Sequence, residues 1–199
     1  MTSQVISIKR YKRRKAAGNV KGVGLCALFS RPGDWAFDYA LALARAHQCR
    51  LNVFYFLQSP YKLRRDVVFV DAAHTQTAPV TPELIAQKDR ELREQFDDRL
   101  GDYTDVGFRL CEGADEWELR KCFRRGQYDV LVICYEKRGA NFGGTNTIEG
   151  FALSFKWPVV MVGPDAPDSF YLNQPAEDWL EHLMIPQGHW KAIDPSAVP

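Results

Sequence analysis

The chain has 199 residues, of which 46% are hydrophobic and 26% are charged, so it can bury the core of one globular domain. Its formal net charge of +1 at pH 7 gives the whole molecule no strong electrostatic preference. No apolar run reaches the ~20 residues of a membrane-spanning helix, and no apolar segment follows the basic start, so we expect a cytoplasmic protein without a secretory signal.

The charge is unevenly distributed along the chain. Residues 1–21 hold seven Lys or Arg and no acid, whereas residues 164–199 hold six Asp or Glu and one Lys. We therefore predict three parts: a disordered basic arm over residues 1–19, an α/β domain over 20–163, and an acidic, Pro-rich C-terminal extension over 164–199. Two interpretations of the arm stay open, a solvated tail or a segment that contacts nucleic acid or an anionic membrane surface.

The body begins with an apolar run at residues 21–29 that predicts a strand buried on both faces. The sequence SRPGD breaks this run, and Asp34 is expected to cap a helix over residues 35–47, whose apolar residues recur at three- and four-residue spacing. Residues 50–57 are rich in β-forming side chains and predict the second strand.

Residues 58–80 form a long irregular connection, which is unusual inside a compact domain and indicates a lid or a partner surface. The sequence TPE at residue 81 marks the start of a helix that runs to about residue 100. Residues 105–111 predict the third strand. A further helix follows residue 113, and four of its residues are expected to face inward: Trp117, Leu119, Cys122 and Phe123.

Residues 128–135 predict a buried fourth strand, followed by the glycine-rich loop RGANFGGTN, a helix over 145–156 and a strand from Pro158 to Val162. Continuously apolar strands that alternate with helices predict a doubly wound, Rossmann-like α/β fold: a five-stranded, mostly parallel sheet with helices on both faces. The tail that follows has one short predicted helix, at 176–184. It either wraps the body or a protein partner through apolar side chains, or it is a loose extension; those side chains are Trp179, Leu180, Leu183 and Trp190.

Ligands bind open parallel sheets at the carboxyl ends of the strands, where the strand order reverses. The loops after the first and fourth strands carry suitable residues, because glycines let the backbone approach an anion and a helix start offers free N–H groups. The candidate phosphate-binding residues are Ser30, Gly139, Gly143, Gly144, Thr145 and Asn146. A plain connector is the alternative, since neither GxxxxGK[ST] nor GxGxxG is present.

Cysteine and histidine spacing indicates no reactive centre. The five cysteines lack a CxxC pair and stand in apolar contexts, which is typical of core thiols. The four histidines form no HxxxH or HExxH pattern. We therefore expect no bound metal and no enzymatic activity.

The order of these segments resembles the universal stress protein family over residues 20–163. FDYALALARAHQCRLNVFYFL resembles its first helix and second strand, and GGTNTIEGFALSFKWPVVMVG resembles its Gly-Ser/Thr helix and last strand. The resemblance implies a fold like that of the adenine-nucleotide alpha hydrolases and a regulatory role in the stress response. It also implies ATP or AMP as ligand and a homodimer through the edge strand from Pro158 to Val162.

Nucleotide-binding members of that family carry an Asp directly after strand one and the spacing G-x2-G-x9-G-[ST] after strand four. Here residues 28–30 read Leu-Phe-Ser in place of that Asp, and only the Gly144–Thr145 pair matches the end of the loop motif. Two functions therefore stay open. One is a regulatory protein that binds a nucleotide or another phosphate anion after strand four, and the other is a degenerate dimeric scaffold that binds protein partners and no nucleotide.

Overall fold

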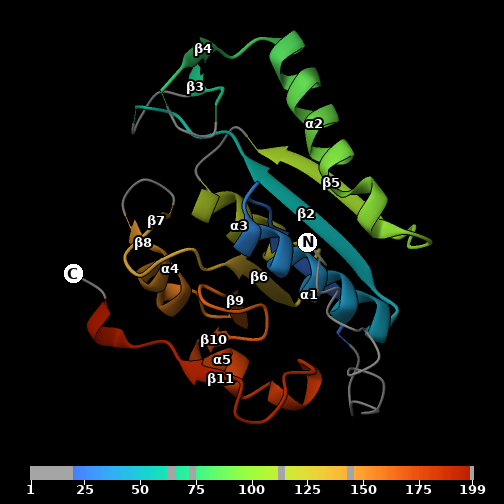
Figure 1. Cartoon of the computed structure of the whole chain (residues 1–199), viewed down its shortest axis with the longest axis vertical. Helices are drawn as coiled ribbons and strands as arrows, with labels where there is room; N and C mark the ends of the chain where they lie inside the picture. The colour runs from blue at the N-terminus through green and yellow to red at the C-terminus, as the bar shows by residue number, and fades with distance from the viewer. Residues whose placement is uncertain (1–19, 62–65, 72–74, 112–114, 143–145, 198–199) are drawn as a thin grey trace, which may run out of the picture.

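The computed structural model describes residues 20–61, 66–71, 75–111, 115–142 and 146–197. Within these ranges, seven strands form one sheet in the order β11-β10-β9-β6-β1-β2-β5 (Figure 1). Its five parallel strands are the five predicted from sequence: β1 (Gly22–Cys26), β2 (Arg50–Phe56), β5 (Val106–Cys111), β6 (Val130–Cys134) and β9 (Val159–Val162). The doubly wound α/β fold class is confirmed, with two strands more than the sequence predicted.

Helices cover both faces of the sheet. Val130, Val132 and Cys134 of β6 face one core, which α1 (Arg31–His47) and α2 (Pro82–Leu100) complete. Residues Leu131 and Ile133 face a second core under the other two helices, α3 (Asp115–Arg124) and α4 (Ile148–Ser154). Because the central strands are buried on both sides, they are continuously apolar in sequence.

The first helix begins earlier than its predicted start at residue 35. Ser30 is the N-cap, and its Oγ accepts a hydrogen bond from the Gly33 N–H at 3.2 Å. The predicted cap, Asp34, lies instead in the first turn and forms an ion pair with Arg99 at 2.6 Å. A Cβ at Gly33 would lie 1.9 Å from the Leu28 carbonyl oxygen, so this tight turn into α1 requires glycine.

The long connection over residues 58–80 has structure of its own. Strands β3 (Val67–Phe69) and β4 (Thr77–Pro79) pair antiparallel as a separate two-stranded sheet near the start of α2 (Figure 1). Lys88 of α2 donates to the Val70 carbonyl at 3.1 Å. This contact fastens the small sheet to the helix.

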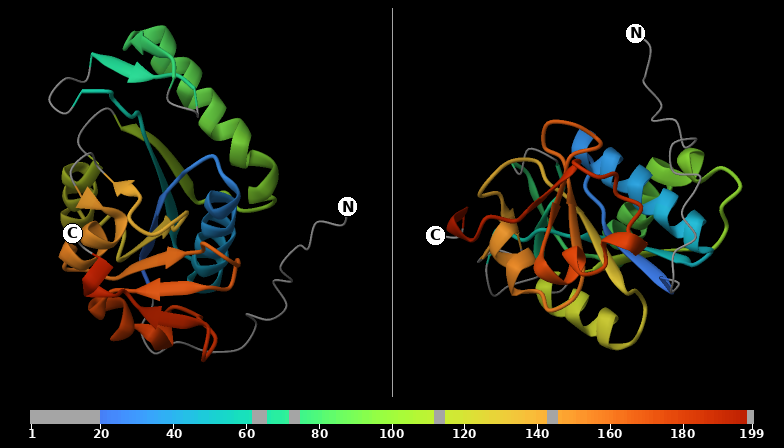
Figure 2. Two further views of the ribbon diagram at one scale, coloured as in Figure 1. Left: turned by 60° about the vertical axis from the view of Figure 1, so that its left-hand side comes forward. Right: turned by 90° about the horizontal axis from the view of Figure 1, so that it is seen from below.

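The C-terminal segment extends the main sheet (Figure 2). Strand β10 (Phe170–Leu172) pairs antiparallel with β9, and β11 (Trp190–Ala192) pairs parallel with β10. Between them lie α5 (Gln174–Glu177) and η2 (Leu180–His182), and η3 (Pro195–Ala197) follows β11. The prediction that the strand from Pro158 to Val162 is an edge strand is therefore wrong, because β10 occupies its outer side.

The tail wraps its own body, which was one of the two interpretations of the sequence. Leu183 is fully buried in the core beneath α1, and three partly buried side chains pack against the same core: Trp179, Leu180 and Trp190. The Tyr39 hydroxyl donates to the Leu183 carbonyl at 2.7 Å. In the described residues, no helix combines the length and apolar character needed to cross a membrane.

Candidate functional site at the carboxyl ends of β1 and β6

The loops after β1 and β6 leave the same edge of the sheet from neighbouring strands. The two strands pair in parallel, with Val23 opposite Val130 and Cys26 opposite Ile133. From β1 the chain continues to β2 and β5 on one side, whereas β6 and β9 lie on the other. The candidate residues predicted from sequence therefore follow the two strands at the switch point, where ligands bind in open α/β sheets.

A carboxylate of the protein itself occupies the beginning of the glycine-rich loop. Glu149 lies in the first turn of α4 and is 2% exposed. Its Oε1 accepts from the Tyr135 hydroxyl at 2.7 Å and from the Gly139 N–H at 3.0 Å. The backbone donor that was expected to meet a phosphate therefore already has an anionic partner.

Tyr135 closes this arrangement from the end of β6. Burial, together with its hydrogen bond to Glu149, raises the pKa of the Tyr135 hydroxyl, which stays protonated and donates. Its ring meets that of Tyr171, from β10, edge-on at 5.0 Å. The C-terminal strand thus packs against the residue that holds Glu149.

The loop after β1 is also occupied by internal contacts. The Ser30 Oγ accepts the hydrogen bond that caps α1, as described above. Beside it, the Phe29 ring stacks on Tyr55 at 4.8 Å between centroids. An aromatic pair thus stands in the region where the resemblance to universal stress proteins implied an acidic contact.

The remaining predicted site residues are placed as follows. Gly143, Gly144 and Thr145 lie outside the described residues, and the backbone of Asn146 begins β8 (Asn146–Thr147), paired with β7 (Asn141–Phe142). The helix that follows begins at Ile148, with Thr147 as N-cap, rather than at Thr145.

The C-terminal segment also reaches this loop. Arg138 Nη2 lies 3.6 Å from Asp194 Oδ2, and both side chains are exposed. Sequence analysis missed Glu149, Tyr135 and Asp194. A glutamate in the first turn of a helix is a common helix-start signal, and nothing in its spacing distinguishes one that turns back to a loop amide.

Two cysteines and one histidine lie in buried environments inside the fold. Burial raises the pKa of the Cys49 thiol to about 11 and that of Cys134 to about 12, so both are protonated near neutral pH. His47 accepts from the Val20 N–H at 3.3 Å and donates to the His182 carbonyl at 2.7 Å, which occupies both ring nitrogens. The described part of the chain contains no cluster of His, Cys, Asp and Glu arranged to hold a metal ion.

No protein-family model matches the sequence, and no curated protein matches it. Among solved structures, the chain is similar to a universal stress protein in complex with cAMP, with 20% identity and a TM-score of 0.50 over 74% of this chain and 100% of that one. It is also similar to the universal stress protein UspA from Lactobacillus plantarum, with 12% identity and a TM-score of 0.50 over 73% and 99% of the two chains. The protein therefore has the fold of the universal stress proteins, as its sequence resemblance predicted, at low sequence identity.

Proposed function

We propose that the protein is a non-catalytic regulatory protein that acts by binding a macromolecular partner, and that its own Glu149 replaces a phosphate ligand in the loop after β6. The observation that carries this proposal is the pair of hydrogen bonds from Gly139 and Tyr135 to the buried Glu149 carboxylate. The buried, protonated thiols and the internally bonded His47 support a role without catalysis.

Electrostatics explains why Glu149 disfavours a nucleotide at this point. A phosphate group carries about −1.5 to −2 charges near neutral pH. Two like unit charges 4 Å apart repel by about 4 kcal/mol at the effective dielectric constant of a protein surface. A nucleotide phosphate beside Gly139 would therefore have to displace Glu149, and the displaced carboxylate would lose both of its donors.

The test is the thermal midpoint of unfolding with and without excess ATP, AMP or cAMP. We expect no nucleotide-dependent rise in the wild-type chain. Glu149→Gln removes the charge while keeping an acceptor for Gly139, so any latent anion site should then show a rise. Glu136→Gln, an exposed neighbouring acid, is the matched control and should behave as the wild type. A ligand present at 100 times its Kd adds ~2.7 kcal/mol to the free energy of unfolding, so a thermal midpoint of the wild-type chain that rises with nucleotide concentration would overturn the proposal.

A second candidate function is the binding of ATP, AMP or a cyclic nucleotide at the same edge of the sheet. Two observations favour it: the adjacency of the β1 and β6 loops, and the cAMP bound to one protein of similar fold. In that case Ser30 and the loop from Gly143 to Asn146 supply the phosphate contacts. Native mass spectrometry of the purified full-length chain distinguishes the two functions, because a co-purified nucleotide supports this one alone.

A further inference from the structure

The outer face of α3 carries one tryptophan and four cations. Trp117, Arg120, Lys121, Arg124 and Arg125 are spaced at i, i+3, i+4, i+7 and i+8, so they lie on one side of the helix and its C-terminal end. Leu119 and Cys122 are fully buried, as the sequence predicted. Trp117, which was also predicted to face inward, is 63% exposed.

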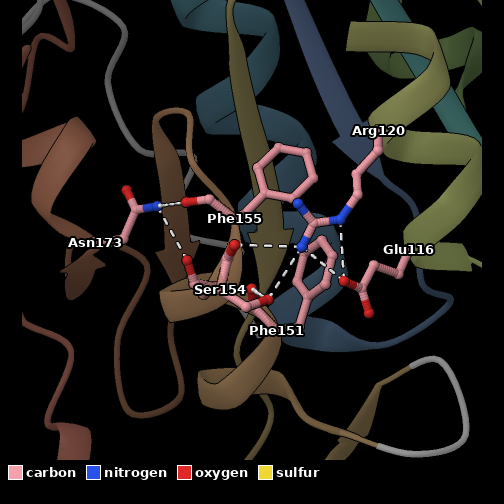
Figure 3. A network of polar contacts seen from close by, with 7 residues as sticks. Glu116, Arg120, Phe151, Ser154, Phe155 and Asn173 are labelled. Carbon is pink, nitrogen blue, oxygen red and sulfur yellow. Dashed lines mark hydrogen bonds and ion pairs between the residues drawn. The ribbon is translucent and has the colours of Figure 1, made fainter. Parts of the chain in front are cut away.

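The same five side chains line a surface hollow of about 190 Å³. Two of the cations are already held. Arg120 contacts Glu116 at 2.6 Å and the carbonyl and hydroxyl of Ser154 at 3.2 Å each, and it lies over the Phe155 ring (Figure 3). Lys121 lies 5.0 Å from the centre of the Trp117 ring and 3.5 Å from Glu118. Arg120 thereby fixes one wall of the hollow.

The two arginines at the end of α3 differ from these. Arg124 and Arg125 are exposed, and no carboxylate within the described ranges forms an ion pair with either. Cations at a helix C-terminus complement the helix dipole, which gives them a modest structural role. That role explains neither the second arginine nor the exposed tryptophan. Burying a large apolar side chain stabilises a fold by about 1.5–3 kcal/mol, and the exposed Trp117 does not contribute this stabilisation.

We propose that the face formed by Trp117, Arg120, Lys121, Arg124 and Arg125 binds single-stranded nucleic acid. A base stacks on the exposed tryptophan, and the unpaired guanidinium groups contact phosphates, which is how proteins bind single strands without reading their sequence. An acidic peptide would use the cations but has no planar ring to stack on Trp117, so the nucleic acid uses more of this surface. The inference is independent of whether the loop after β6 binds a nucleotide.

The test is fluorescence anisotropy of labelled 12-nucleotide single-stranded DNA and RNA with the full-length protein at 50 and 200 mM salt. Stacking is worth about 1–3 kcal/mol per base, so Trp117→Ala should weaken binding about 5- to 150-fold. The double variant Arg124→Ala/Arg125→Ala should weaken binding and flatten its salt dependence. Each variant is first checked for an unchanged thermal midpoint.

Matched controls are Tyr61→Ala, which removes another exposed aromatic ring, and Arg90→Ala, which removes an exposed cation on α2. Neither should change the affinity for the oligonucleotide. The proposal is overturned if the wild-type protein does not bind either oligonucleotide, or if Trp117→Ala binds as tightly as the wild type. It is also overturned if a 12-residue poly-Glu peptide competes as strongly as unlabelled oligonucleotide, since the surface would then recognise negative charge alone.

Discussion

Asn173 joins three elements through hydrogen bonds of its buried side chain. The side chain is 1% exposed, and its Oδ1 accepts from the backbone N–H groups of Val159 and Ala176 at 2.9 and 3.1 Å. Its Nδ2 shares its two hydrogens among three carbonyls at the end of α4 and just beyond it, those of Ala152, Phe155 and Trp157. Figure 3 shows the bond to Phe155. One amide thus ties the C-terminal segment to α4 and to the start of β9.

We expect Asn173→Ala to lower the free energy of unfolding by about 3 kcal/mol, because it leaves several buried polar groups without a partner. Urea denaturation of both proteins measures the difference. Gln174→Ala, at the exposed neighbouring position, is the control and should change stability by less than about 0.5 kcal/mol. A loss below 1 kcal/mol for Asn173→Ala would show that the junction does not depend on this side chain.

Asp71 should make the stability of the protein depend on pH in the acid range. Its carboxylate accepts from the Gln76 N–H at 2.7 Å and from the Thr75 hydroxyl at 2.7 Å, and these bonds lower its pKa to about 2. A folded-state pKa below the unfolded value of about 3.9 stabilises the fold above that pH, and this contribution is lost as the pH falls towards 2. Asp71→Asn should therefore be less stable than the wild type at pH 7, with the difference shrinking at pH 2.5. Urea midpoints at the two pH values check this, with Asp98→Asn on α2 as the control; a difference that grows in acid would contradict it.

At the level of elements, β10 covers the side of β9 that would otherwise be a free edge of the sheet. All four residues of β9 are completely buried, and an apolar strand with a free edge is a template for self-association. Here Tyr171 of β10 pairs opposite Met161 of β9, so the chain covers this edge with its own segment. We predicted a homodimer through this strand, but β9 already pairs with β6 on one side and with β10 on the other, so its backbone is not free to pair with a second chain.

Deleting residues 164–199 should convert the protein into a self-associating or aggregating chain, because it uncovers β9. Multi-angle light scattering after size exclusion measures the mass of both proteins. A milder variant, Tyr171→Pro, interrupts the pairing of β10 and should act in the same direction, whereas Lys191→Ala in β11 should not. A truncated chain that remains folded and monomeric would contradict the covering role of β10.

For the whole molecule, the burial of the five cysteines predicts how fast its thiols react with a reagent in solution. All five are buried, and for Cys49, whose pKa is about 11, only about one thiol in a thousand is ionised at pH 8. We therefore expect a colorimetric thiol reagent to react slowly with the native protein and to find five thiols after unfolding in urea. Rapid reaction of one thiol in the native state would contradict the assignment of all five to the core.

Some features of the fold followed from local sequence because local physics dominates them. The central strands β1, β6 and β9 are continuously apolar, and α2 begins at its predicted cap, since the Thr81 hydroxyl accepts from the Leu84 N–H at 3.2 Å. Other features depended on contacts between residues that are far apart in the sequence. Ser30 rather than Asp34 caps α1, because Asp34 pairs with Arg99, which lies far away in sequence.

The sequence by itself determined the fold class, the five parallel strands and the four longest helices, because periodicity and capping act within a few residues. The tertiary structure alone decided three things: that the acidic tail becomes β10 and β11, that Glu149 takes the donors of the loop after β6, and that Trp117 faces outward. Each depends on which segments pack together in the folded chain. A residue's spacing along the chain does not specify which of several possible partners it will meet.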